Sequence, residues 1–424
     1  MRYLLIFIYL LITFFSFGQI PTTYQSYLEK ARDYYSKKDY PNFYESLKSA
    51  NQIHPYHQGI LYQLGVAEAL TNRPEEAIDH LTKAIYINAE YDLTIPELES
   101  LENFGEYDLL LELQTKLQAP IVKSDTAFII KDRELHIESI TYATKSREFY
   151  LGSIHQRKII RINKNGEVSD FTKSAESGLA AVFGLKVDAK RKILWACSSP
   201  MPEMLNYDTL AKSAVFKFDL ASGKVLEKYT PSTNQKEFVF GDLALTSQGE
   251  VFVSDSKNNI IFKVNSKLRT LEPFFQSSEL WNLQGLAFSP DDHLLFIADY
   301  VKGPYQLNMQ TKQLTKLSSD LKESLKGIDG LTFYNNDLIA IQNGVNPLCV
   351  TRLDLGYKQE RIINFQILDR KHPAFNEPTI GTIVGDHFYY VANSQWGGYN
   401  EDHSIKPKAE LQDIVILKRK LAKK

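Results

Sequence analysis

A short phrase recurs six times between Glu138 and the C-terminus, and this repeat constrains the fold more than any other feature. Each copy has a small or acidic residue followed by an apolar one, then a gap, then an apolar run ending in Ser, Asp or Asn. The copies begin at Ser139-Ile140, Gly184-Leu185, Asp242-Leu243, Gly285-Leu286, Gly330-Leu331 and Gly381-Thr382. They follow one another at intervals of 43 to 58 residues, close to the period of roughly 40–50 residues that is typical of radially or linearly stacked sheets. A unit of this size cannot bury both of its faces alone, so the copies must pack against each other.

Each copy continues with a segment in which apolar and polar residues alternate, as at residues 160–163 and 216–219. Alternation with period two is typical of a strand with two unlike faces. Turn-forming residues such as those at 163–166 then reverse the chain. Six sheet-sized repeats predict an all-β propeller with six blades, spanning residues 125–424.

A strand-like segment from Thr126 to Ile130 precedes the first copy, and the last copy ends at residues 415–418, close to the C-terminus. We expect this early segment to complete the last blade and to close the ring, because closure leaves no long free sheet edge.

The first residues have the pattern of an export signal. Arg2 precedes an apolar run from Tyr3 to Phe17, and small residues stand at positions 16 and 18. This predicts a signal peptide over residues 1–18 that is cleaved after Gly18. The alternative is an uncleaved membrane anchor, for which the run is short. We therefore expect a periplasmic or secreted protein without a membrane span after cleavage.

Composition narrows the class of protein further. The chain has 424 residues, of which 43% are hydrophobic and 24% charged, with a net charge of −2. These values are ordinary for a soluble globular protein and give no overall basic field for nucleic acid. The two cysteines, Cys197 and Cys349, fall in blades two and five of the predicted ring. We expect both to be buried free thiols, too far apart for a disulfide.

Residues 20–120 have a helical pattern with a spacing of 34 residues between small or apolar positions. The matched pairs are Ala31 with Gly65, Leu47 with Leu81, and Ala50 with Ala84. This region resembles tetratricopeptide repeats, with units at about 24–56 and 59–92 and a weaker third unit. The resemblance implies a groove for a protein or peptide. The alternative is a helical stack that only packs on the propeller.

The residue just before each repeated pair should face the channel mouth of the propeller. These six positions hold Glu138, Phe183, Gly241, Gln284, Asp329 and Ile380. Carboxylate and amide oxygens from separate blades suit Ca²⁺, which accepts such ligands in loose geometry. Asp242 and Asn343 are further oxygens nearby. The alternative is that Glu138 and Asp329 only bind channel waters and backbone amides.

Segments 137–140, 283–291 and 328–332 resemble the senescence-marker-protein (regucalcin)/gluconolactonase family, and more broadly the strictosidine-synthase-like and paraoxonase-like propellers. The similarity extends over residues 125–417. It implies a calcium-dependent hydrolase in which Glu138 and Asp329 bind the metal and take part in catalysis. Gln284 stands where the family has a metal-binding Asn, and Gly241 stands where another Asn is expected. The family's ligand set is therefore incomplete at Gly241.

Other candidates for the channel lip are His155, Tyr300, Asn343 and Trp396. Residues 393–399, here called the lip segment, are rich in glycine and aromatic residues and form either a mobile lip or a long turn. His372 and His403 fall in predicted loops without a visible partner. The sequence contains no nucleophile elbow, phosphate loop or zinc-type cysteine pair.

Two functions remain open from the sequence. The favoured one is an exported, calcium-assisted hydrolase of a small lactone or ester. The other is a non-catalytic envelope protein that recognises a protein, peptide or glycan. Both rest on the same expected architecture, a short helical repeat domain followed by a six-bladed all-β propeller.

Overall fold

The computed structural model describes residues 23–232 and 237–422. The predicted signal peptide lies outside the described residues. The chain forms two compact units. The first contains the described residues up to Ala119 with the short segments Lys322–Ser324 and Val345–Pro347, and the second contains the rest. N-terminal helices are thus followed by a mostly β, propeller-like region, as the sequence predicts.

The first unit consists of helices that pack in consecutive pairs, α1 with α2 and α3 with α4. Its helices are α1 (Thr23–Ser36), α2 (Tyr40–Ile53), α3 (Gln58–Leu70), α4 (Pro74–Ile87), η2 (Pro96–Leu101) and α5 (Gly105–Gln118). Gly65 shows why small residues recur at this spacing. A Cβ atom there would lie 2.7 Å from Cγ of Leu81, so only glycine lets α3 and α4 approach this closely. Asp39 begins α2 by accepting a bond from the backbone N–H of Asn42.

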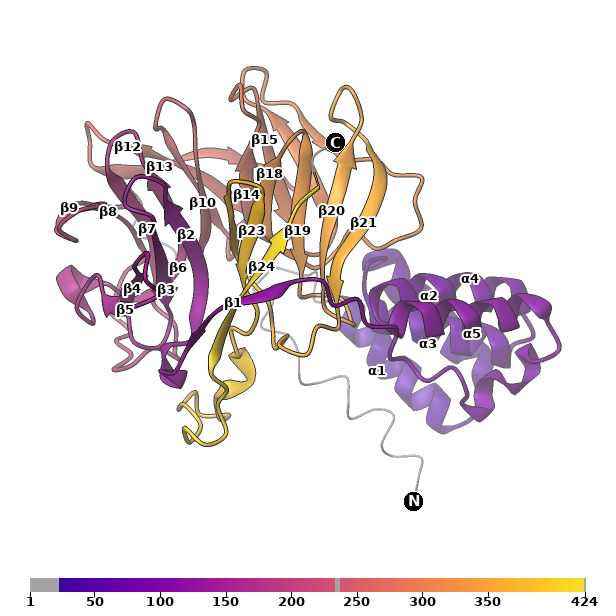
Figure 1. Ribbon diagram of the computed structural model, residues 1–424. Helices are drawn as coiled ribbons and strands as arrows, with labels where there is room; N and C mark the ends of the chain where they lie inside the picture. Colours follow the sequence, from indigo (N-terminus) through magenta and orange to yellow (C-terminus); the bar gives the residue numbers. More distant parts are fainter. Residues whose placement is uncertain (1–22, 233–236, 423–424) are drawn as a thin grey trace. The chain divides into compact units, whose positions relative to one another are not determined.

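The second unit is built from antiparallel sheets in which strands adjacent in sequence pair with each other (Figure 1). Three four-stranded sheets follow the chain directly. They contain β2 (Ile137–Ala143), β3 (Glu148–Ser153), β4 (Lys158–Ile162) and β5 (Val168–Asp170); β14 (Leu283–Phe288), β15 (Leu294–Asp299), β16 (Gly303–Asn308) and β17 (Leu314–Lys316); and β18 (Ile328–Tyr334), β19 (Asp337–Gln342), β20 (Cys349–Leu355) and β21 (Ile362–Arg370).

A larger sheet has eight strands in two antiparallel groups of four. They are β6 (Ala181–Asp188), β7 (Ile193–Ser199), β8 (Ala214–Asp219), β9 (Val225–Pro231), β10 (Phe240–Leu245), β11 (Val251–Asp255), β12 (Ile260–Asn265) and β13 (Thr270–Gln276). The two groups join only through a short parallel pairing of their outer strands, Thr270 with Thr230 and Leu271 with Pro231.

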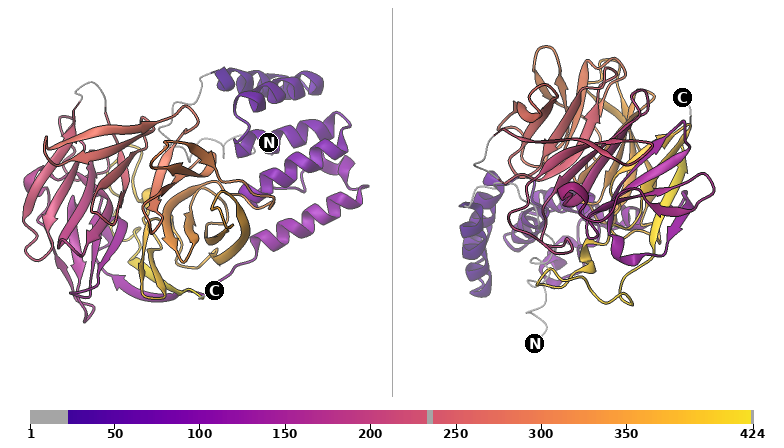
Figure 2. Two further views of the ribbon diagram at one scale, coloured as in Figure 1. Left: turned by 90° about the horizontal axis from the view of Figure 1, so that it is seen from above. Right: turned by 90° about the vertical axis from the view of Figure 1, so that its left-hand side faces the viewer.

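The last sheet combines both ends of the second unit. It contains β22 (Gly381–Val384), β23 (His387–Val391), β24 (Ile414–Lys420) and β1 (Asp125–Ile130), in the order β1-β24-β23-β22. Ile130 pairs with Ile414, and Asp125 pairs with Lys418. Figure 1 labels β1 beside the yellow β24, and the right-hand view of Figure 2 shows purple and yellow strands side by side. The predicted pairing of residues 126–130 with the last sheet is confirmed.

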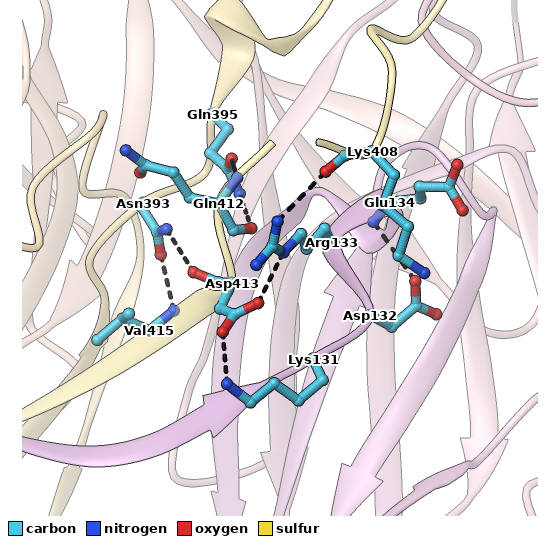
Figure 3. A network of polar contacts seen from close by, with 10 residues as sticks. All are labelled: Lys131, Asp132, Arg133, Glu134, Asn393, Gln395, Lys408, Gln412, Asp413 and Val415. Atoms are coloured by element: carbon cyan, nitrogen blue, oxygen red, sulfur yellow. Dashed lines mark hydrogen bonds and ion pairs between the residues drawn. The ribbon is translucent and has the colours of Figure 1, made fainter. Parts of the chain in front are cut away.

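Polar contacts reinforce this closure just beyond β1 (Figure 3). Lys131 Nζ lies 2.6 Å from Oδ2 of Asp413, and Arg133 Nε lies 2.7 Å from its Oδ1. On the other side, the Asn393 amide donates to the backbone carbonyl of Asp413 at 2.8 Å and accepts from the N–H of Val415 at 2.7 Å. The residues before β24 are therefore held from both directions.

The first strands of successive sheets touch one another through the small or acidic residue of the repeated phrase. A Cβ atom on Gly184 would lie 2.7 Å from Cα of Asp242, so β6 and β10 approach closely only with glycine there. Ser139 Oγ donates to the carbonyl of Phe183. Asp242 Oδ2 accepts the N–H of Leu286 at 3.1 Å. The repeated residue thus makes the contact between neighbouring sheets.

The core lies between adjacent sheets and is aliphatic and aromatic. One cluster joins the first and last sheets through buried residues that include Ile130, Ile140, Leu151, Val391 and Ile416. Cys197 and Cys349 are free and buried, as predicted. Burial raises the pKa of both thiols, so neither is an activated nucleophile.

Candidate functional site

Glu138 lies on β2 and is 7% exposed. Two side chains of the lip segment bind its carboxylate: Ser394 Oγ donates to Oε2, and Trp396 Nε1 donates to the same oxygen at 3.1 Å. Both donors bind Oε2, so neither of these hydrogen bonds uses the other oxygen, Oε1.

Asp329 lies on β18 and is partly exposed. Asn343 Nδ2 donates to its Oδ2 at 2.8 Å and also to the carbonyl of Pro378 at 3.1 Å. The hydroxyl of Tyr300 donates to Oδ1 of Asn343 at 3.0 Å. Three predicted residues thus form one hydrogen-bonded group, in which the bond to Asp329 uses Oδ2 and not Oδ1.

Gln284 lies on β14, and its side chain has a fixed orientation. Its Nε2 donates to Oδ1 of Asn282 at 2.8 Å, which turns Oε1 to the opposite side. A Cβ atom on Gly241 would lie 3.5 Å from that Oε1. The longer Gln284 side chain therefore brings its oxygen beside the position where Gly241 offers no side chain.

Close backbone packing brings these residues onto neighbouring strands. A Cβ atom on Gly285 would lie 2.7 Å from the carbonyl oxygen of Asp329, and one on Gly330 would lie 2.8 Å from that of Thr379. Thr379 Oγ1 in turn donates to the carbonyl of Glu138 at 2.7 Å. The strands that carry Gln284, Asp329 and Glu138 are thus linked in that order.

The site concentrates negative charge. Burial raises the pKa of Glu138 well above its usual range, and the charge of Asp329 raises it further. Burial likewise raises the pKa of Asp329, the Asn343 hydrogen bond opposes this, and the charges of Asp242 and Glu377 add to it. These carboxyls interact closely enough to perturb one another. They must share protons or a cation to avoid repulsion.

Asp242 has a different environment from the other carboxyls. Its Oδ2 is occupied by the Leu286 N–H, and Lys186 Nζ lies 3.7 Å from its Oδ1. Both oxygens of Asp242 therefore already interact with protein groups, the Leu286 N–H and the Lys186 ammonium. Asp242 links neighbouring strands, and this differs from the expected role of a further channel oxygen.

The lip segment contains the short helix η5 (Trp396–Gly398) and covers Glu138 from one side. The Trp396 ring meets the His136 ring edge-on, with centroids 4.4 Å apart. Tyr399 OH lies 2.6 Å from Nδ1 of His136. His155 is near this group, with its ring centroid 5.9 Å from that of Tyr399, and its Nδ1 donates to the carbonyl of Glu203 at 2.7 Å.

Two histidines differ from expectation. His403 Nδ1 lies 2.7 Å from Oε1 of Glu203, and His372 Nδ1 accepts the N–H of Ala374 at 3.1 Å. The expectation that they lack partners is wrong. A loop remote in sequence supplies Glu203 to His403, whereas His372 is bound within its own turn.

Several residues at the site were not singled out from the sequence. Ser394 lies in the lip segment that was noted, but its bond to Glu138 had no signal of its own. Glu377 raises the pKa of Glu138 and precedes the last repeated phrase, in a loop with a left-handed φ of 61°. Irregular backbone of this kind leaves no periodic pattern to detect.

Polar residues at the ends of the second strands serve mostly structural roles. Ser153 Oγ donates to the carbonyl of Leu135, and Asp255 Oδ1 accepts the N–H of Val239 at 2.9 Å. In the sheet β18–β21 this task falls to Gln342, whose Nε2 donates to the carbonyl of Lys326 at 2.8 Å. Because Gln342 makes this backbone contact, Asn343, one residue further on, does not make it and binds Asp329 instead.

Over residues 23–232 and 237–422, no three His, Cys, Asp or Glu side chains form a ready metal-binding group. The sequence-predicted residues Glu138, Asp329 and Gln284 supply two carboxylates and an amide, and Ca²⁺ accepts oxygens of both kinds. In the same part of the chain, no helix is long and apolar enough to cross a membrane.

Comparison with known proteins shows similarity only to solved structures of low sequence identity. No protein-family profile matches the chain, and no curated protein matches it. A gluconolactonase from Xanthomonas campestris is 13% identical, with 71% of this chain and 98% of that chain covered and a TM-score of 0.47. Regucalcin from Agrobacterium tumefaciens, a calcium-binding protein, is 14% identical, covering 70% and 96% with a TM-score of 0.48. Virginiamycin B lyase from Staphylococcus aureus is 11% identical, covering 72% and 100% with a TM-score of 0.48.

Proposed function

We propose that the second unit is a six-bladed propeller whose channel binds a divalent cation, Ca²⁺ in the first instance, and hydrolyses a small lactone or ester. The observation that carries the proposal is shared by Glu138, Asp329 and Gln284. In each side chain one polar atom is anchored by protein, and these bonds leave one oxygen unused. Anchored hard oxygens are what such a cation needs from a preorganised site.

The blade count is part of the proposal. Each antiparallel group of four strands would be one blade, including the two groups that share the eight-stranded sheet. Each first strand contacts the next one, in the order β2, β6, β10, β14, β18 and β22, and β22 contacts β2 again. These contacts support a closed ring of first strands. Such a ring would place the six residues that precede the repeated pairs around one axis.

The chemistry follows from the residues themselves. A bound cation would supply Lewis acidity toward a carbonyl oxygen. The chain's own part is to hold and orient the substrate, and to exclude water with the stacked rings of Phe183 and Trp396, whose centroids are 6.4 Å apart. We assign to Asp329 the proton released by the attacking water, because its carboxylate lies at the proposed cation site and a carboxylate can act as a general base there.

The first test is cation binding by the full chain. A cation that binds only the folded state stabilises it by about 2.7 kcal/mol at a concentration of 100 times Kd. Chelation should therefore lower the melting temperature, and Ca²⁺ should restore it. Glu138→Gln and Asp329→Asn should each weaken this response, whereas Asp170→Asn on the exposed outer strand β5 should leave it unchanged.

The second test is turnover of a panel of lactones and aryl esters. Glu138→Gln and Asp329→Asn should abolish hydrolysis if the channel is the active site. A calcium response without turnover of any substrate would favour a binding protein over an enzyme. No calcium response, with both variants as stable as the parent chain, would refute the cation site.

A second candidate function concerns the first unit. A small cleft between α1, α2 and α3 is lined by the apolar residues Leu28, Phe43 and Ile60, and Arg32 and Gln63 also contribute to its lining. We propose that it receives an apolar side chain of a protein or peptide partner. Leu28→Lys in the full chain should reduce capture of that partner, and equal capture by both chains would refute this role.

Export is proposed from the sequence alone. If residues 1–18 are a signal peptide, expression in a secreting bacterial host should give a mature chain that begins at Gln19. An N-terminus at Met1 on the recovered protein would contradict cleavage.

A further inference from the structure

Asn343 uses both ends of its side-chain amide. Its Oδ1 accepts the Tyr300 hydroxyl at 3.0 Å. Its Nδ2 donates to Asp329 Oδ2 at 2.8 Å and to the carbonyl of Pro378 at 3.1 Å. Rotating the amide by 180° would place Oδ1 against two acceptors, so the orientation is determined by its neighbours.

Tyr300 is itself held in place. A Cβ atom on Gly344 would lie 2.6 Å from Cζ of the Tyr300 ring, so the ring packs directly against glycine backbone. The carbonyl of Tyr300 accepts the N–H of Gly327 at 2.8 Å. The ring is therefore confined, and its hydroxyl is a fixed donor for Asn343.

The consequence for Asp329 is that one carboxylate oxygen is committed to protein. The same holds for Glu138, whose Oε2 takes both Ser394 and Trp396. These hydrogen bonds compete with a cation for one oxygen of each carboxylate, so the other oxygen is the one that each offers most readily. Gln284 adds one amide oxygen.

We propose that Tyr300 and Asn343 are positioning residues that determine cation selectivity, by restricting Asp329 to coordination through a single oxygen. This inference rests on the proposed cation site. Ca²⁺ takes six to eight oxygens and accepts carboxylates through two oxygens, whereas Mg²⁺ requires six in a compact octahedron and keeps several waters. Coordination through a single oxygen removes the advantage that Ca²⁺ has over Mg²⁺ when a carboxylate binds through two oxygens. It also leaves about half of a six-coordinate shell to water or substrate oxygens.

The experiment measures binding of Ca²⁺, Mg²⁺ and Mn²⁺, each alone, to the full chain by titration calorimetry. Asn343→Leu removes the hydrogen bond that anchors Asp329, and Tyr300→Phe removes only the hydroxyl that orients Asn343. Loss of a residue that orients a metal ligand typically lowers affinity about 10–100-fold. We expect that loss for Mg²⁺ and Mn²⁺, and a smaller loss for Ca²⁺, because a released Asp329 can bind it through both oxygens.

The decisive readout is therefore the ratio of Ca²⁺ to Mg²⁺ affinity. This ratio should rise about tenfold in Asn343→Leu and by a smaller factor in Tyr300→Phe. Tyr300→Phe keeps the proposal testable if Asn343→Leu does not fold. Gln342→Leu is the matched control, because it removes a neighbouring buried amide that binds the Lys326 carbonyl and not Asp329. It should change stability without changing the ratio.

The outcomes separate the two proposals. An unchanged ratio in Asn343→Leu and Tyr300→Phe, with cation binding by the parent chain, overturns the selectivity role alone. A ratio that shifts equally in Gln342→Leu overturns it as well, because a general loss of rigidity would then explain the effect. Absence of binding of all three cations by the parent chain overturns the cation site and this inference together.

Discussion

Ile130 provides a sharp test of the closing strand. It is the last residue of β1 and is 3% exposed, packed against the first and last sheets. Its neighbour Ile129 is 52% exposed on the opposite face of the same strand. Ile→Ala at each position therefore compares the same chemical change with and without burial.

The expected cost follows from the atoms removed. Ile130→Ala deletes three buried carbons at about 0.8 kcal/mol each, or about 2.4 kcal/mol, before any cavity is counted. The unfilled space adds to this, and buried Ile→Ala changes cost about 2–5 kcal/mol. Ile129→Ala should cost no more than about 0.5 kcal/mol, as for most surface substitutions. At about 2–4 °C per kcal/mol, Ile130→Ala should lower Tm by at least about 5 °C.

Tryptophan fluorescence during urea unfolding is the suitable assay. The chain has three tryptophans. They are Trp195, Trp281 and Trp396, and all of them lie in the second unit, so the signal reports on that unit. The slope m should stay constant in both variants, since the surface exposed on unfolding is unchanged. Equal midpoints for Ile129→Ala and Ile130→Ala would refute the view that β1 is an integral strand of the last sheet.

Truncation tests the same strand without a point substitution. A chain that starts at Asp132 lacks β1 and exposes the edge of β24, whereas one that starts at Pro120 keeps it. We expect the shorter chain to be less stable and more prone to aggregate. Equal stability of the two chains would contradict closure.

Three further predictions concern pH and packing. Burial, and next the charge of Asp329, raises the pKa of Glu138, so the folded state holds this proton more tightly than the unfolded state. With a chelator present, the protonated Glu138 should contribute its whole stabilisation below about pH 4, and this contribution should be lost as pH rises through the folded-state pKa. Glu138→Gln should flatten this dependence of Tm on pH. In the helical unit, the Glu68 hydrogen bond raises the pKa of His80, so that pair should stabilise the helices below about pH 6.5 and less as pH rises above it. Thermal loss of the helical circular-dichroism signal should show the change, and His80→Gln should remove it. Gly184→Ala should cost about 1–3 kcal/mol by urea unfolding because its Cβ would meet Asp242, whereas Gly397→Ala, with nothing within 4 Å, should cost little.

The repeat made much of the fold predictable. Small residues recur before an apolar residue because the first strands of neighbouring sheets touch there, as Gly184 and Asp242 show. Because the contact recurs, each copy has a small or acidic residue at the same place, and the repeat is visible in the sequence. The closing strand was predictable for a related reason: residues 126–130 have a strand pattern without a partner in their own copy.

The site was predictable only in part. Glu138, Gln284 and Asp329 occupy equivalent places in the repeat, so their positions follow from the register of the strands. Their anchoring does not, because it depends on irregular segments. Ser394 reaches Glu138 from the long connection between β23 and β24, where no period applies. At the end of β19 the structural role that Ser153 and Asp255 play in other sheets falls to Gln342, and Asn343 lies one residue later. Sequence spacing alone does not reveal this shift of one residue.

The pairing of β1 with β24 also has a consequence for how the protein is made. Asp125 pairs with Lys418, so nearly the whole second unit must be synthesised before this sheet can be completed. Until then, the apolar side of β1, including Ile130, has no cover. Contacts so distant in sequence form slowly, and uncovered strands invite association between chains. Newly made chains therefore pass through a stage in which they depend on chaperones or on delayed folding, and this vulnerable period ends only when the two ends of the unit meet.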